Sequence, residues 1–294
     1  MPSRQNSRDG IFIYFHCMNT ICVNGKIIPA DKPALLASNR GYRYGDGLFE
    51  TMKIIGGKII LAPLHFERLF NSLELMKFKI PKLFTVEKLQ EEILSLVKKN
   101  RCEQLARTRL SVFRGHGGLY DNDKDKEPHY VIECWPLNES VNRLNENGFV
   151  LDIYPTARKS CDIFSNLKTA NFLPYTMAAL YAKEKKLNDC LVLNTAGNIA
   201  DATIANIFLI ENEIITTPAL SEGCVNGVIR KKILDSGLPV NESIVTSKDV
   251  LKADEVFLTN AVSGIRRVKQ FGDKTYTNLK TIEIYDGFIT PTFY

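Results

Sequence analysis

Two sets of strand and helix patterns run along the chain, and a polar segment at residues 137–148 separates them. At 294 residues the chain is long enough for two medium-sized domains, each with its own buried core. The patterns therefore predict two α+β domains, an N-terminal one at 18–136 and a C-terminal one at 149–294, with a cleft between them that suits a ligand. Residues 1–17 are expected to form a leader without fixed structure.

The first set begins with a hairpin pattern. Short apolar runs on either side of Asn24 and Gly25 predict two strands, because this dipeptide suits the positive φ angles of a tight turn. Residues 85–100 predict a helix, since apolar side chains recur at helical spacing and the last turn is basic. Two more strands are expected at 109–113 and 130–135.

The second set alternates strands with helices. The apolar runs and their turn signals predict strands at 149–154, 190–194, 207–210 and 255–259, and helices at 174–186 and 228–236. Gly237 provides a stop for the second helix.

The composition narrows the classes of function. The formal net charge of +5 is spread over interspersed basic and acidic residues, with no basic stripe that would indicate nucleic-acid binding. Seven cysteines, an odd number without a C-x-x-C pair, indicate reduced thiols in a cytoplasmic protein. The four histidines lack the spacing of metal ligands, and no apolar run reaches the ~20 residues of a membrane span. We therefore expect no metal, no nucleic acid and no membrane partner.

Several side chains are candidates for catalysis or ligand binding, although each has an ordinary structural explanation when it is taken alone. Lys168 lies in a polar segment before a predicted helix, and most lysines are solvated surface residues. Arg68 lies on a predicted helix, where an arginine commonly forms a surface ion pair. Asp201 follows a turn and suits local backbone contacts. Glycines before the helix predicted at 228–236 leave backbone N–H groups free where the helix dipole is positive, which suits a phosphate.

Five short motifs nevertheless occur in one order along the chain. They lie at residues 40–51, 65–69, 168–171 and 197–208, and at 227–230 together with 257–260. In this order they resemble the class IV aminotransferase family, the fold-type IV enzymes that depend on pyridoxal phosphate. The resemblance covers roughly residues 20–270. It implies a two-domain α+β fold with an N-terminal antiparallel sheet plus helices and a C-terminal, barrel-like α/β domain that binds the cofactor.

The resemblance also implies roles for individual residues. Lys168 would hold the aldehyde of pyridoxal 5'-phosphate and move the α-proton of the substrate, for which burial should lower the pKa of its amine. Arg68 would pair with the cofactor phosphate, helped by the backbone N–H groups of Val228 and Ile229. Asp201 would bond the ring nitrogen and keep it protonated. Further cofactor contacts are expected at Ala205, Asn206 and Ala261.

The chain departs from the family pattern at three positions. Asp201 stands where the family normally has Glu, so a shorter carboxylate must reach the ring. Phe172 replaces a Tyr that many members carry, which removes a hydroxyl near the cofactor oxygen. Ala261 stands where branched-chain aminotransferases have a Thr that contacts phosphate.

Within the family, the motifs are closest to those of aminodeoxychorismate lyase. Thr51 matches a Thr characteristic of the lyases, where its hydroxyl can relay a proton to the departing pyruvate. Residues 114–120 resemble a glycine-rich loop of the lyases, although this stretch also fits a flexible connection. The lyase reaction converts 4-amino-4-deoxychorismate to 4-aminobenzoate and pyruvate in folate synthesis. Substrate-binding residues are expected at Tyr44, Arg107, Arg109 and Arg114, and the alternation of a strand puts the middle two on one face.

Two other functions remain open at this stage. The same cofactor and residues would also serve an aminotransferase that acts on branched-chain or D-amino acids. A relative that only binds phosphate ligands without catalysis is the alternative outside the enzyme class, and the presence of both Lys168 and Arg68 argues against it. By resemblance we expect a homodimer that acts on a small-molecule substrate.

Overall fold

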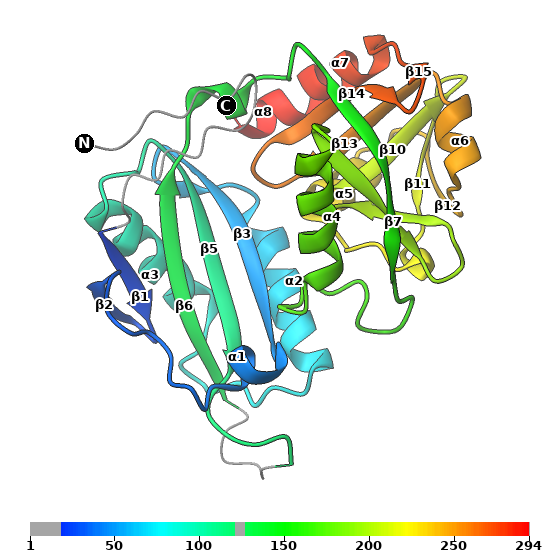
Figure 1. The fold of residues 1–294 in the computed structure, drawn as a ribbon. Coiled ribbons are helices and arrows are strands. Elements are labelled where there is room, and N and C mark those ends of the chain that lie inside the picture. The colour runs from blue at the N-terminus through cyan, green and yellow to red at the C-terminus, as the bar shows by residue number, and fades with distance from the viewer. Residues whose placement is uncertain (1–18, 121–126, 294) are drawn as a thin grey trace.

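The computed structural model of the protein describes residues 19–120 and 127–293, so the leader predicted at 1–17 lies outside the described residues. The chain builds two sheets, each accompanied by helices (Figure 1). This arrangement confirms the α+β class with an N-terminal antiparallel sheet. The division into domains on either side of 137–148 stays a prediction.

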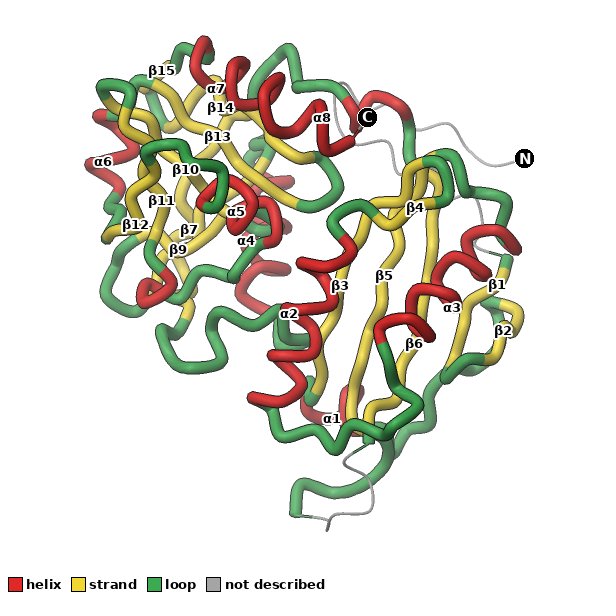
Figure 2. Tube along the Cα trace, turned by 180° about the vertical axis from the view of Figure 1, so that it is seen from behind, coloured by secondary structure: helices red, strands yellow, loops and turns green. Residues whose placement is uncertain are grey.

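The first sheet has six strands in the order β2-β1-β6-β5-β3-β4, and every pairing within it is antiparallel. Figure 2 shows α2 and α3 lying across one face of this sheet. The strands are β1 (Thr20–Val23), β2 (Lys26–Pro29), β3 (Gly47–Ile55), β4 (Lys58–Ile59), β5 (Leu105–Arg114) and β6 (Pro128–Pro136), and the helices are α1 (Arg40–Tyr44), α2 (Ala62–Leu75) and α3 (Val86–Lys99).

The predicted hairpin and helix are both confirmed. Asn24 and Gly25 have φ angles of 48° and 81°, as the tight turn between β1 and β2 requires. Thr85 caps α3, because its side chain accepts a hydrogen bond of 3.3 Å from the backbone N–H of Lys88. The apolar stripe of α3 packs into the core of the first sheet through Leu89, Ile93, Leu96 and Val97.

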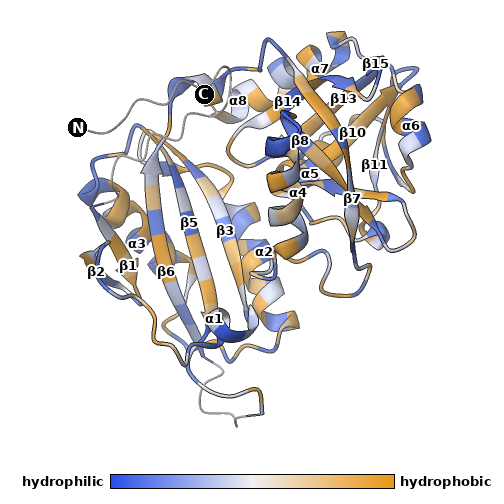
Figure 3. Ribbon diagram, viewed as in Figure 1, coloured by the Kyte–Doolittle hydropathy of each residue, from blue (hydrophilic) through white to orange (hydrophobic). Residues whose placement is uncertain are grey.

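The two faces of the first sheet differ in polarity. Hydrophobic and hydrophilic bands alternate along β5 and β6 (Figure 3), because neighbouring side chains of a strand point to opposite faces. Met52 and Ile54 of β3 are fully buried in the core beneath the helices. Thr51 of β3 lies opposite Arg109 of β5, and both line a cavity on the other face.

The second sheet has nine strands, eight of them in the order β12-β11-β10-β13-β14-β7-β8-β9, with β15 paired to β14. It mixes parallel and antiparallel pairings and curls, as the predicted barrel-like half implies. Its strands are β7 (Phe149–Lys159), β8 (Asp189–Asn194), β9 (Ile199–Ala202), β10 (Asn206–Glu211), β11 (Ile214–Pro218), β12 (Val240–Ser243), β13 (Glu255–Asn260), β14 (Gly264–Phe271) and β15 (Lys274–Thr275).

Five α-helices accompany the second sheet in the described residues. Both predicted helices are present, and three further short ones follow towards the C-terminus. They are α4 (Leu173–Glu184), α5 (Val228–Leu234), α6 (Ser247–Lys252), α7 (Leu279–Ile284) and α8 (Thr290–Phe293). Across the described ranges, no helix has the length and apolar character needed to cross a membrane.

The polar segment at 137–148 packs against the second sheet. The buried guanidinium of Arg266, on β14, donates hydrogen bonds to the carbonyl oxygens of Val141 at 3.0 Å and Arg143 at 2.7 Å. The neighbouring Arg267 donates through its backbone N–H to the side chain of Asn145 at 2.8 Å. The connection between the sheets is therefore anchored by side-chain contacts.

Candidate active site

A cavity of about 690 Å³ lies between the two sheets, a volume typical of small-molecule sites. Its walls include residues of β3, β5, β9 and β10, the start of α5 and the segment after β13. Eleven of the thirteen predicted site residues line it, namely Thr51, Arg68, Arg107, Arg109, Lys168, Asp201, Ala205, Asn206, Val228, Ile229 and Ala261.

Lys168 lies half-buried in the segment that leads to α4. Its carbonyl oxygen accepts a hydrogen bond of 2.9 Å from the Phe49 backbone N–H, which ties this segment to β3. The Nζ atom lies 4.4 Å from the centroid of the Phe49 ring and 5.6 Å from that of Phe172. Burial, and next the positive charge of Arg68, lower the pKa of Lys168 to about 8. A substantial fraction of this amine is therefore neutral near physiological pH and able to act as a nucleophile.

Arg68 is held in a fixed orientation by groups from two other parts of the chain, Glu50 and Asn226. From α2, its Nε and Nη2 atoms donate to the two oxygens of Glu50 at 2.8 and 2.6 Å. Its Nη1 atom donates to the carbonyl oxygen of Asn226 at 2.8 Å. Since a guanidinium has five N–H donors, two remain for an anion in the cavity.

Glu50 is a site residue that the sequence analysis missed. Burial alone would raise the pKa of this carboxyl, but Arg68 and His65 outweigh burial and hold the pKa at about 2. His65 Nδ1 lies 2.6 Å from a Glu50 oxygen. The sequence did carry a signal for this residue. Glu50 lies between Leu48 and Met52 on the same face of β3, and that face otherwise points into an apolar core, where a charged residue needs a partner.

Further hydrogen-bond donors that could bind the same anion as Arg68 lie at and near the start of α5. The backbone N–H groups of Val228 and Ile229 belong to the first turn, where a helix offers them no acceptor of its own. The hydroxyl of Thr259 is buried in the cavity wall and has no hydrogen-bond partner among the described residues. Gly227 lies so close to Asn206 that an added Cβ would overlap the Asn206 side-chain oxygen. Together with Arg68, these groups fit a phosphate.

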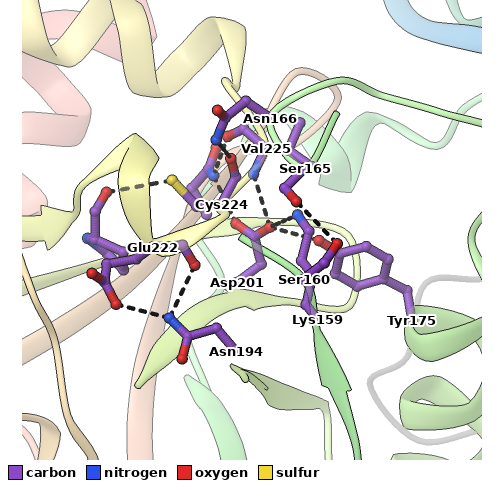
Figure 4. A network of polar contacts seen from close by, with 12 residues as sticks. Lys159, Ser160, Ser165, Asn166, Tyr175, Asn194, Asp201, Glu222, Cys224 and Val225 are labelled. Carbon is purple, nitrogen blue, oxygen red and sulfur yellow. Dashed lines mark hydrogen bonds and ion pairs between the residues drawn. The ribbon is translucent and has the colours of Figure 1, made fainter. Parts of the chain in front are cut away.

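Asp201 occupies the wall formed by β9 and is almost completely buried. Its carboxylate accepts hydrogen bonds from Lys159 Nζ at 3.2 Å, Tyr175 Oη at 2.7 Å and the Val225 backbone N–H at 2.9 Å (Figure 4). A fourth comes from Asn206 Nδ2 at 2.9 Å. The sequence analysis did not foresee Lys159 or Tyr175, which reach Asp201 from β7 and α4.

The wall formed by β5 carries two half-buried arginines. The guanidinium of Arg107 lies 4.4 Å from the centroid of the Trp135 ring, and that of Arg109 lies 3.7 Å from the centroid of Phe49. Burial lowers the pKa of both guanidinium groups, and the nearby carboxylate of Glu133 opposes this effect. Two partly desolvated cations on one wall favour an anionic ligand.

The structure does not bring the other two predicted residues to this cavity. Tyr44 is exposed, and its ring lies 5.5 Å from the Arg40 guanidinium. Arg114 forms an ion pair with Asp46 and lies 4.3 Å from the centroid of the Phe78 ring. Both residues lie at the far end of the first sheet.

A lysine with a lowered pKa lies beside hydrogen-bond donors that suit a phosphate, and this arrangement fits a phosphorylated carbonyl cofactor. The chain belongs to the class IV aminotransferases, since residues 47–271 match the family described as Amino-transferase class IV. Members of this family use pyridoxal phosphate, and the residues of the cavity fit it. Lys168 suits the aldehyde, whereas Arg68, the α5 N–H groups and the unpaired Thr259 hydroxyl suit the phosphate.

Relatives of this chain carry different activities in their names. A putative branched-chain-amino-acid aminotransferase of Methanocaldococcus jannaschii is 26% identical over 270 residues, which cover 90% of this chain and 92% of that protein. Aminodeoxychorismate lyase of Vibrio harveyi is 26% identical over 235 residues, covering 78% and 84%. The crystal structure of branched-chain aminotransferase from Thermoproteus uzoniensis with norvaline superimposes with a TM-score of 0.82 at 18% identity, covering 93% and 94%, and shows the same fold.

Proposed function

We propose that this protein is an aminodeoxychorismate lyase, which converts 4-amino-4-deoxychorismate to 4-aminobenzoate and pyruvate. The observation that carries the proposal is the wall of β3 and β5, where a hydroxyl and two guanidinium groups share the cavity of Lys168. The residues concerned are Thr51, Arg107 and Arg109.

The charge of this wall suits the proposed substrate. It has two carboxylates, one on the ring and one on the group that leaves as pyruvate, and each can pair with one guanidinium. The side chain of a branched-chain amino acid is apolar and would gain little from two partly desolvated arginines. The aromatic faces of Phe49 and Trp135 lie against the same arginines and suit a flat ring.

Each residue then has a defined task. When bound, pyridoxal phosphate supplies an electron sink next to the substrate's α-carbon. Lys168 takes the α-proton on its Nζ atom, which the lowered pKa of about 8 allows. Thr51 gives a proton to the departing pyruvate. Arg107 and Arg109 keep the substrate oriented so that these transfers occur over short distances.

The test compares wild type with Lys168→Ala, Thr51→Val and Thr51→Ser, each purified with pyridoxal phosphate. Wild type should show the visible absorbance band of a cofactor joined to lysine, and Lys168→Ala should lack it. On addition of 4-amino-4-deoxychorismate, wild type should release pyruvate and 4-aminobenzoate in equal amounts. Thr51→Val should keep the band and lose about a hundredfold in the rate of pyruvate release, while Thr51→Ser keeps most of it.

Other outcomes point elsewhere. If wild type turns ordinary amino acids into keto acids and releases no pyruvate from 4-amino-4-deoxychorismate, the protein is an aminotransferase. The name and coverage of the Methanocaldococcus jannaschii relative favour that second candidate. If wild type lacks the band, the enzyme hypotheses fail, and the remaining one is a relative that binds phosphate ligands without catalysis.

A further inference from the structure

A short stretch of backbone, residues 224–226, runs between several groups of the candidate site. On one side, the Nδ2 atom of Asn166 donates to the carbonyl oxygens of Leu220 at 2.8 Å and Cys224 at 2.7 Å. The backbone carbonyl oxygen of Asn166 accepts a hydrogen bond of 3.0 Å from the Asn226 N–H. Asn166 therefore holds this stretch through both its side chain and its main chain.

The opposite side of the same backbone faces residues that are expected to contact the cofactor. The Val225 N–H donates to Asp201 at 2.9 Å, and the Val225 carbonyl oxygen accepts from Asn206 Nδ2 at 2.7 Å. Arg68 donates to the carbonyl oxygen of the next residue at 2.8 Å. Figure 4 shows Asn166 on one side of Val225 and Asp201 on the other. The groups that this backbone holds in place form the cofactor seat, namely Arg68, Asp201, Asn206, Val228 and Ile229.

Lys168 follows Asn166 by two residues and is also tied to the first sheet. Its carbonyl oxygen accepts a hydrogen bond of 2.9 Å from the Phe49 N–H on β3. The segment that carries the amine thus has one attachment to β3 and another, through Asn166, to the backbone of residues 224–226. Loss of the Asn166 side chain would remove two hydrogen bonds of the second attachment and leave the contacts of the cofactor seat in place.

We propose that Asn166 is a positioning residue that sets where the amine of Lys168 lies relative to the cofactor seat. The inference rests on one part of the proposed function, that Lys168 joins pyridoxal phosphate. A cofactor bound by its phosphate and its ring presents its aldehyde at one fixed point. The rate of attack then depends on how well the amine meets this point, and a misplacement of about 1 Å can cost about a hundredfold.

The chemistry of an asparagine suits this task. Its planar amide carries two N–H donors in a fixed geometry. Asn166 directs them at two carbonyl oxygens of the same segment, those of Leu220 and Cys224. The side chain is therefore held in one orientation, and the main chain next to Lys168 cannot shift without breaking these hydrogen bonds.

The test follows the visible band that develops when cofactor-free protein meets pyridoxal phosphate. Asn166→Ala should lower the rate of this development by about a hundredfold. Asn166→Ser, whose hydroxyl can still donate to one carbonyl oxygen, should lower it less. Pyridoxal lacks the phosphate and is not fixed in the seat, so wild type should react with it more slowly, and Asn166→Ala should leave that slower rate nearly unchanged.

A second measurement separates positioning from a general loss of structure. Pyridoxine 5'-phosphate has the ring and the phosphate but no aldehyde, so its affinity for cofactor-free protein reports on the seat alone. Calorimetry should give the same affinity for wild type and Asn166→Ala. Asn100→Ala is the matched control, because Asn100 forms similar hydrogen bonds, to Thr20, and does not line the cavity. It should change neither this affinity nor the rate with pyridoxal phosphate.

Three results would overturn the inference. The first is an unchanged rate with pyridoxal phosphate in both Asn166 variants. The second is an equal loss of this rate and of the affinity for pyridoxine 5'-phosphate in Asn166→Ala, which would make Asn166 a structural support of the whole seat. The third is an equal rate of wild type with pyridoxal and with pyridoxal phosphate, which is decisive even if the variants fail to fold.

Failure of the proposed function is a separate observation. A wild type that develops the band but releases no pyruvate contradicts the proposed lyase and leaves the role of Asn166 standing. A wild type without the band removes the basis of both.

Discussion

At the scale of single residues, the chemistry of the site depends on the protonation of one amine. Lys168 must be neutral to attack an aldehyde, and burial together with Arg68 lowers its pKa from 10.5 to about 8. Because the folded pKa lies below the unfolded value, the protonated lysine is disfavoured in the folded protein. The free energy of unfolding of the cofactor-free protein should therefore rise as the pH increases from about 8 to about 10.4.

The same shift predicts how fast the cofactor is taken up. The initial rate at which cofactor-free protein develops the visible band should increase with pH and reach half its maximum near pH 8. Stopped-flow absorbance between about pH 6 and about pH 11 measures this profile, in a range that includes the usual lysine pKa of about 10.4. Arg109→Met should move the midpoint to higher pH, because the positive charge of Arg109 also lowers the pKa of Lys168. A midpoint near that of a free lysine would contradict the environment described for this amine.

Residues with sequence motifs were predicted better than the residues that support them. Lys168, Arg68 and Asp201 were singled out by the family resemblance, and all three line one cavity. Glu50 and Lys159 were not found, because their roles depend on contacts across the fold. Glu50 meets Arg68 from 18 positions away, and Lys159 meets Asp201 from 42 positions away. The polar Glu50 on an otherwise apolar face of its strand marks it as unusual, but no local pattern tells which distant residue Glu50 or Lys159 meets.

At the scale of elements, the close contact between the start of β10 and the start of α5 controls the shape of the candidate cofactor site. Gly227 precedes α5 with a φ angle of −69°, which any residue can adopt, so the backbone alone does not require glycine there. The requirement is steric, since a Cβ would overlap Asn206, which donates to Asp201 at 2.9 Å. Gly227→Ala should therefore displace Asn206 and disturb the donors at Val228 and Ile229.

We expect Gly227→Ala to lower the free energy of unfolding by about 1–3 kcal/mol, as overpacked sites do, and to weaken binding of pyridoxal phosphate. Urea unfolding and a titration of the visible band measure the two effects. Gly287→Ala is the matched control, because no atom lies within 4 Å of the added Cβ, and its effect should stay within about 1 kcal/mol. Equal effects of the two substitutions would show that Gly227 is not a point of close packing.

Elements with strong local patterns were predicted well, and elements without them were missed. The helix at 85–100 has a complete apolar stripe and a cap, and α3 spans Val86–Lys99. By contrast, β14 contains three charged residues in Gly264–Phe271, so it lacks the apolar run of a buried strand. It forms because β13 and β7 pair with it on either side and the segment at 137–148 covers Arg266.

At the scale of the whole molecule, the cavity depends on the position of the two sheets relative to each other, since both contribute to its walls. The cleft was predicted from the two sets of patterns, but the contacts that fix it were not. Arg266 is central among them, because it lines the cavity and holds the segment at 137–148 through the carbonyl oxygens of Val141 and Arg143. Removing its guanidinium would leave both carbonyl oxygens, of which that of Val141 is buried, without this donor.

Arg266→Met should therefore loosen the segment at 137–148 and lower the free energy of unfolding by about 3 kcal/mol, the effect of losing buried hydrogen bonds to a charged group. Hydrogen exchange should quicken at backbone amides of that segment, while the amides of α3, in the core of the first sheet, keep their relative protection. Lys269→Met, an exposed substitution on the same strand, should change neither quantity. If Arg266→Met leaves exchange in the segment unchanged, the side chain does not anchor the connection, and the geometry of the cavity must depend on direct packing between the sheets.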